Sequence, residues 1–94
     1  MVSDEQMSKK GKRKSKIMEK PARSDITFDE MHSFLIDMGF IEKNKGHGGS
    51  HCLYMHKDDD MPVNIQSYEG LIKKYQVVQV QKIVEDIAQQ EKEN

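Results

Sequence analysis

The densest group of residues that could do chemistry is the glycine-rich segment KGHGGSH near the middle of the chain. A histidine accepts and releases protons near neutral pH, so His51 is a candidate general acid or base. Gly48 and Gly49 carry no Cβ, and their amides can come close to an anion such as phosphate. Lys45 and Ser50 add a positive charge and a hydroxyl group. A histidine after a glycine-rich turn is more often an ordinary surface residue, so the segment indicates acid–base chemistry without deciding for it.

A metal site is the second chemistry that this part of the chain raises. The candidate ligands lie close together in sequence: His47, His51, Cys52, His56 and the aspartates at 58–60. The two glycines between His47 and His51 disfavour a helix that would bring both onto one face, and adjacent residues of a strand point to opposite faces. A lone cysteine also forms no internal disulfide and cannot hold a zinc finger by itself. For these reasons we expect that the chain binds neither a metal ion nor another cofactor.

Charge divides the chain into two parts. Residues 1–24 hold eight Lys or Arg against three Asp or Glu, a net of +5, whereas residues 25–94 hold seven against thirteen, a net of −6. Only two of the 20 Ile, Leu, Val and Phe residues lie in the first part. We therefore expect a flexible basic arm over 1–24, with at most one helical turn near 16–20, followed by a compact domain over 25–94.

The composition excludes several classes of protein. With 94 residues the chain has room for one domain. Its longest apolar run has four residues, which is too short to span a membrane. No apolar region follows the charged N-terminal residues as it would in a secretory signal. We therefore expect a cytoplasmic protein without a membrane partner.

The clearest element is a helix predicted over residues 28–38. Thr27 and Glu30 form the T-x-x-E pattern of a capping box, in which each side chain satisfies a backbone amide of the first turn. Apolar residues recur at the spacing of one helix face: Phe28, Met31, Phe34, Leu35 and Met38. Gly39 suits the left-handed residue that ends a helix, and we expect Phe40 to fold back onto the last turn.

Three strands are predicted after this helix, at 40–45, 51–57 and 61–66. The aspartates at 58–60 are predicted to form an exposed turn, because three adjacent carboxylates cannot share a dry site. Short loops between the strands favour an antiparallel meander. In the second strand, His51 shares its parity with Leu53 and Met55, which would place it on the buried face unless the glycine turn re-aims it or the strand begins later. The sequence leaves open which face of the sheet His51 uses.

A second helix is predicted from residue 75 to about residue 90. Its apolar residues repeat at helical spacing: Val77, Val80, Ile83, Val84 and Ile87. Polar residues, Gln79 and Gln81 among them, cover the rest of its surface. Lys73 and Lys74 come immediately before it, where an anion would also meet the positive end of the helix dipole. The order helix, three strands, helix predicts an α+β fold with a small antiparallel sheet and both helices on one face.

Three segments resemble parts of a known family. Residues 26–40 have a first helix with a glycine–phenylalanine exit, residues 49–51 form a G-S-H motif at the start of a strand, and residues 71–80 lead into the last helix. Together with the order of the elements, they resemble the HicA family of type II toxin–antitoxin systems over about residues 16–88. The resemblance implies a fold like that of double-stranded-RNA-binding domains.

The resemblance also implies an mRNA interferase, an endoribonuclease that a HicB-type antitoxin inhibits. It makes His51 the catalytic residue, with no metal and no small-molecule cofactor. The histidine would act as acid or base while a ribose 2′-hydroxyl attacks the adjacent phosphate. The expected contacts to RNA are Lys45, Gly48, Gly49, Ser50, Lys73 and Lys74.

Two features leave other functions open. Members of the family often have a short stretch with Pro and His after the third strand, and residues 66–70 here, QSYEG, contain neither. The net charge of −6 over 25–94 also works against binding of phosphates unless basic residues gather on one face. The alternatives are a non-catalytic RNA-binding module, and a degenerate toxin that acts as a protein-interaction subunit. In the second case Tyr54 and Tyr68 are candidate partner-facing residues.

Overall fold

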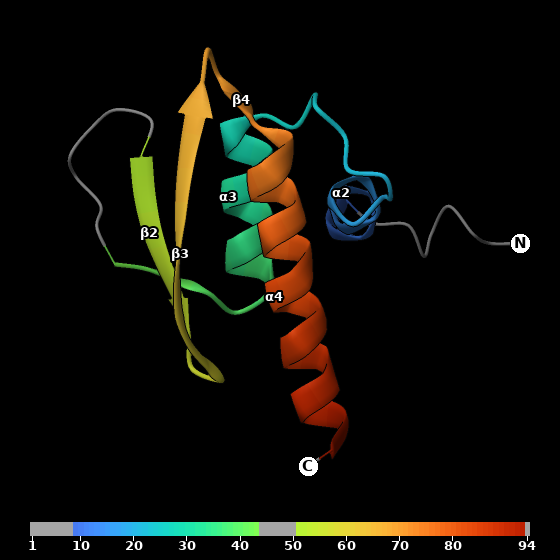
Figure 1. The fold of residues 1–94 in the computed structure, drawn as a ribbon, viewed down its shortest axis with the longest axis vertical. Helices are drawn as coiled ribbons and strands as arrows, with labels where there is room; N and C mark the ends of the chain where they lie inside the picture. Colours follow the sequence, from blue (N-terminus) through green and yellow to red (C-terminus); the bar gives the residue numbers. More distant parts are fainter. Residues whose placement is uncertain (1–8, 44–50, 94) are drawn as a thin grey trace, which may run out of the picture.

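The computed structural model describes residues 9–43 and 51–93, and Figure 1 shows its fold. This part of the chain forms, in order, α2 (Lys9–Ile17), α3 (Phe28–Asp37), β1 (Ile41–Glu42), β2 (His51–His56), β3 (Asp59–Tyr68), β4 (Leu71–Ile72) and α4 (Lys74–Glu93). Among these described helices, none is both long enough and apolar enough to cross a bilayer.

The strands form one antiparallel sheet in the order β1-β2-β3-β4. Both α3 and α4 lie on the same face of this sheet, and α2 lies on the far side of these two helices from β2 and β3 (Figure 1). The predicted α+β class and the antiparallel meander are therefore confirmed. The sheet has four strands in the described residues, where the sequence predicted three.

Both ends of α3 form as the sequence predicts. The Glu30 amide donates to Thr27 Oγ1 over 3.1 Å, and the Thr27 amide donates to Glu30 Oε1 over 2.9 Å, which is a complete capping box. At the other end, Gly39 has a φ of 97°, and the Phe40 amide donates to the Leu35 carbonyl over 2.9 Å. These bonds close the helix in the way that glycine-terminated helices do.

The bounds of the β2–β3 hairpin differ from the predicted ones. A two-residue turn at Lys57 and Asp58 joins the strands, so Asp59 and Asp60 belong to β3. The expected turn over 58–60 is therefore only partly correct. Carboxylates need solvent, and the exposed strand position of Asp60 provides it as well as a turn does. At its other end β3 continues to Tyr68, beyond the predicted end at residue 66.

The fourth strand follows a tight turn. Glu69 and Gly70 have φ values of 54° and 84°, and they return the chain so that β4 pairs with the last two residues of β3. The Ile72 amide also donates to the Ile26 carbonyl over 2.8 Å, so β4 connects the sheet to the segment before α3. A strand of two residues shows no hydrophobic alternation, which is why the sequence pattern does not reveal it.

The hydrophobic core fills the space between the sheet and the helices. Its fully buried large side chains come from every layer: Ile17, Ile26, Met31, Phe34, Leu35, Tyr54, Ile65, Ile72, Val77 and Val80. The presence of Ile17 and of the buried Ala22 in this core shows that the N-terminal segment packs against the domain. This differs from the expected flexible arm, since residues 9–17 form a helix that contacts α3.

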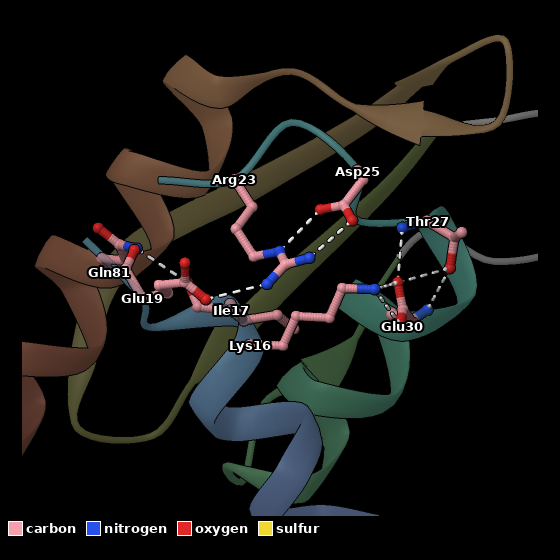
Figure 2. A network of polar contacts seen from close by, with 8 residues as sticks. All are labelled: Lys16, Ile17, Glu19, Arg23, Asp25, Thr27, Glu30 and Gln81. Carbon is pink, nitrogen blue, oxygen red and sulfur yellow. Dashed lines mark hydrogen bonds and ion pairs between the residues drawn. The ribbon is translucent and has the colours of Figure 1, made fainter. Parts of the chain in front are cut away.

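Polar contacts attach α2 and its following segment to the helices beneath them (Figure 2). Lys16 Nζ lies 2.8 Å from Glu30 Oε2 of α3. From α4, Gln81 Nε2 donates to the Ile17 carbonyl over 2.8 Å and to the Glu19 carbonyl over 2.9 Å. The prediction that Gln81 covers the exposed face of its helix is wrong, because its side chain is 3% exposed and caps the end of α2.

Candidate nucleic-acid interface

His51 is the first residue of β2, and its Cα partner in β3 is Gln66. Partners across antiparallel strands are immediate neighbours, with Cα atoms about 4.5–5.5 Å apart. The backbone of His51 is therefore fixed near the end of β3 that leads into β4 and α4. The other predicted residues of the glycine-rich segment lie outside the described part of the chain: Lys45, Gly48, Gly49 and Ser50.

The face of β2 that packs on the helices is the one opposite to Leu53 and Met55. Tyr54 is fully buried and His56 is 6% exposed, so these two positions face the helices. Leu53 and Met55 are half-buried and lie on the other face. Both parities of this strand hold comparable apolar side chains, so alternation by itself does not select the core face.

The predicted lysine pair lies where the sequence places it. Lys74 is the first residue of α4, and Lys73 precedes it with its carbonyl accepting from the amides of the first turn. Both side chains are exposed. Lys73 Nζ lies 4.6 Å from the centroid of the Tyr68 ring. Within the described residues neither lysine forms an ion pair with a carboxylate, so both charges are available to an anion.

Two exposed aromatic side chains flank these lysines. Tyr68 is 62% exposed and Tyr75 is 65% exposed. We call Tyr68, Lys73, Lys74 and Tyr75 the aromatic–basic corner. A hollow of about 130 Å³ in this corner is lined by Gln66, Ser67, Tyr68, Lys73 and Tyr75, with no carboxylate among its lining residues. Gln66, one of these lining residues, is the Cα partner of His51 across the β2–β3 ladder. The aromatic–basic corner and the backbone of His51 therefore lie at the same end of the sheet.

Tyr75 is the part of this corner that the sequence analysis missed. It stands directly after the lysine pair and was interpreted only as the start of a helix. The available signal was an aromatic residue in the first turn, outside the apolar stripe that Val77, Val80 and Val84 form. A large aromatic side chain outside the core-facing stripe must either meet solvent or bind a partner.

Tyr54 is not partner-facing, and that prediction is wrong. Its hydroxyl shares a 2.7 Å hydrogen bond with His32 Nδ1, and burial together with the neighbouring Cys52 raises the pKa of Tyr54. The Cys52 thiol donates to Glu42 Oε2 over 3.1 Å. Burial raises the pKa of Cys52, and the Glu42 carboxylate raises it further. A thiol with a raised pKa is a poor nucleophile, so we interpret Cys52 as a structural residue.

His56 also has structural partners. Its Nε2 donates to the Met38 carbonyl over 3.2 Å, and its Nδ1 accepts from the Asp58 amide over 3.0 Å. Potential metal-ligating atoms of His56, Asp58 and Glu91 lie within 4.8 Å of one another. Because both ring nitrogens of His56 are already bonded, the imidazole has no free nitrogen to offer to an ion.

Comparison with known proteins adds no relative. No family model matches this chain, and no curated protein or solved structure matches it significantly. What the site does is therefore inferred from its own residues and their arrangement.

Proposed function

We propose that this chain is an endoribonuclease toxin of the HicA type, which cleaves mRNA in the cytoplasm and is inhibited by a HicB-type antitoxin. The fold that we propose is a double-stranded-RNA-binding-like core of α3, β1, β2, β3 and α4, to which α2 and β4 are added. Two observations support this: the α–β–β–β–α order of those elements, and the G-S-H motif that ends at the first residue of β2.

The observation that carries the proposal is the pairing of His51 with Gln66. Gln66 lines the hollow of the aromatic–basic corner, next to Tyr68 and Lys73. A nucleic-acid strand held by the corner would therefore have its sugar–phosphate backbone close to the position of the motif histidine. Proximity of this kind is the first requirement for general acid–base catalysis on a bound strand.

The distribution of charge supports RNA as the ligand in spite of the acidic domain. Three of the eight basic residues of the N-terminal segment pair with carboxylates of α3 and α4: Arg13 with Asp37, Lys16 with Glu30 and Lys20 with Glu85. Lys73 and Lys74 have no such partner within the described residues. A polyanion responds to the local potential, and the corner is a site where positive charge stays unpaired.

The proposed reaction needs no metal. A base removes the proton of a ribose 2′-hydroxyl, and the oxygen attacks the adjacent phosphorus. The bond to the 5′ oxygen breaks, and an acid protonates the leaving oxygen, which yields a 2′,3′-cyclic phosphate and a 5′-hydroxyl. His51 serves in one of these two proton transfers, which contribute typically about 10²–10⁴-fold each. Amides of Gly48 and Gly49, with Lys45 and Ser50, would bind the phosphate as its negative charge increases.

The test is cleavage of a single-stranded transcript by the purified chain in the presence of EDTA. We expect fragments that end in 2′,3′-cyclic phosphate, and a loss of about 10²-fold or more in rate for His51→Ala. His32→Gln is the matched histidine control, since His32 contacts Tyr54 and not the corner. In bacteria, expression of the wild type should arrest growth and degrade mRNA, and co-expression of a HicB-type antitoxin should relieve the arrest.

Other outcomes would select other functions. If His51→Ala cleaves as fast as the wild type, the catalytic assignment is wrong. If neither protein cleaves RNA but both bind it equally, the chain is a non-catalytic RNA-binding module. If neither cleaves nor binds RNA, a protein-interaction subunit is the remaining alternative.

A further inference from the structure

The exposed tyrosines of the aromatic–basic corner are not among the residues of the hydrophobic core. Tyr68 and Tyr75 are more than half exposed, while Tyr54, the other tyrosine, is fully buried and hydrogen-bonded. An exposed aromatic ring leaves a large apolar face in water and adds little to the core. Two such rings line one hollow, which makes this place the best candidate for a ligand with flat apolar faces.

The polar residues around the rings narrow the class of ligand. Lys73 Nζ lies over the Tyr68 ring, and Lys74 begins α4 next to Tyr75. Gln66 and Ser67, residue types whose side chains can donate and accept hydrogen bonds, also line the hollow. Flat rings, edges that form hydrogen bonds and a negative backbone occur together in nucleic acids. Stacking of bases on aromatic side chains beside basic residues is the usual mode of binding for single strands.

We propose that the hollow between Tyr68 and Tyr75 is a base-stacking pocket that selects single-stranded over double-stranded RNA. In a duplex the faces of the bases are covered by their neighbours, so neither tyrosine could stack on them. In a single strand one base enters the hollow, Lys73 and Lys74 contact adjacent phosphates, and the strand passes the position of His51. The proposal rests on the proposed function only in taking RNA as the ligand, and it concerns binding alone.

The test measures binding by fluorescence anisotropy in the His51→Ala background, so that cleavage does not consume the probe. Three labelled probes of equal length are compared: a single-stranded RNA, its duplex and an abasic strand that keeps the phosphates. Tyr68→Leu and Tyr75→Leu remove the rings, and Tyr68→Phe and Tyr75→Phe keep them. Val78→Ala is the matched control, because Val78 is an exposed residue of the same helix outside the hollow.

We expect each leucine variant to bind the single strand roughly 5- to 150-fold more weakly, which is the range for loss of one stacked base. The phenylalanine variants and Val78→Ala should stay within about twofold of the parent. Binding of the abasic strand should be weak and the same for every variant, because only phosphate contacts remain. Since both tyrosines are exposed, urea unfolding of the leucine variants should match the parent and exclude a folding defect.

Several results would overturn the proposal. Leucine variants that bind the single strand as tightly as the parent would show that the rings do not stack. Tighter binding of the duplex would assign the corner to recognition of double-stranded RNA by shape. These results leave the nuclease proposal standing, since cleavage is measured separately. Conversely, if the chain binds RNA through the tyrosines but does not cleave it, the proposed nuclease function is wrong and the proposed base-stacking pocket is supported.

Discussion

The side-chain amide of Gln81 donates a 2.8 Å hydrogen bond to the main-chain carbonyl of Ile17, the last residue of α2. The same nitrogen donates to the Glu19 carbonyl over 2.9 Å. The last carbonyls of a helix have no partner within the helix, so a buried helix end needs donors from elsewhere. A glutamine of α4 provides a donor to the last carbonyl of α2 here, and this bond joins residues 64 positions apart in sequence.

Replacement of Gln81 by alanine should therefore loosen α2. The change leaves two carbonyls near a buried surface without their donor, and we expect a loss of about 1–3 kcal/mol in the free energy of unfolding. Hydrogen exchange should become faster over residues 9–17 before it changes in α3. Gln79→Ala is the matched control, because Gln79 is an exposed residue of the same helix. Equal stability of the two variants would contradict this role of Gln81.

The contacts of α2 show which parts of the fold the sequence can and cannot predict. The ends of α3 were predictable because a capping box joins residues three apart and a glycine exit acts within one turn. The burial of Ile17 was not predictable, because a single isoleucine among lysines forms no hydrophobic repeat. Its partner Gln81 cannot be told from a surface glutamine by sequence alone. Long-range contacts of single residues leave no local pattern in a sequence.

The same distinction applies to the candidate site. Lys73 and Lys74 were predictable because a basic pair before a helix has a local electrostatic meaning. The relation of His51 to that pair depends on the register of β2 against β3, and the sequence does not specify it. Tyr68 and Tyr75 are seven residues apart in sequence, and they line one hollow because the turn at Glu69 and Gly70 returns the chain between them.

Gly39 and Gly70 allow a controlled test of what a glycine provides. Both have positive φ, 97° and 84°, so alanine at either position should cost about 1–2 kcal/mol of backbone strain. A Cβ at residue 39 would also lie 3.2 Å from Nε2 of His56, the atom that donates to the Met38 carbonyl, whereas a Cβ at residue 70 meets nothing within 4 Å. Urea unfolding should therefore show that Gly39→Ala lowers the free energy of unfolding by roughly 1 kcal/mol more than Gly70→Ala does. Equal losses would mean that the His56 contact contributes nothing.

The Lys16–Glu30 pair should make stability depend on pH in the acid range. Partial burial raises the pKa of Glu30, but the Lys16 ammonium and the Thr27 amide outweigh it and hold the pKa below its ordinary value of 4.5. A lowered pKa in the folded state means that this contribution is complete above the ordinary value and is lost as the pH falls through the lowered one. The wild type should thus exceed Glu30→Gln in stability at about pH 7, and the difference should shrink towards about pH 3.

The control for this pH dependence is the lysine. Lys16→Met removes the ammonium and keeps the capping box, so α3 should still begin at the same residue. The pH-dependent part of the free energy of unfolding should become smaller in this variant. High salt should weaken the effect in the wild type, because both side chains are partly exposed. A difference between wild type and Glu30→Gln that stays constant with pH would assign the role of Glu30 to packing instead of charge.

Gln76 protects the free edge of β3 in the same way that Gln81 protects the end of α2. Its Oε1 accepts from the Gln66 amide over 3.2 Å, and its Nε2 donates to the Asn64 carbonyl over 3.0 Å, as a neighbouring strand would. Gln76→Leu should therefore lower the free energy of unfolding by about 1–3 kcal/mol and leave an unpaired strand edge. Gln90→Leu is the matched control, since it adds an equal apolar side chain at an exposed position of α4. Light scattering at increasing concentration should show self-association for Gln76→Leu alone, and equal scattering by both variants would attribute the effect to the added leucine.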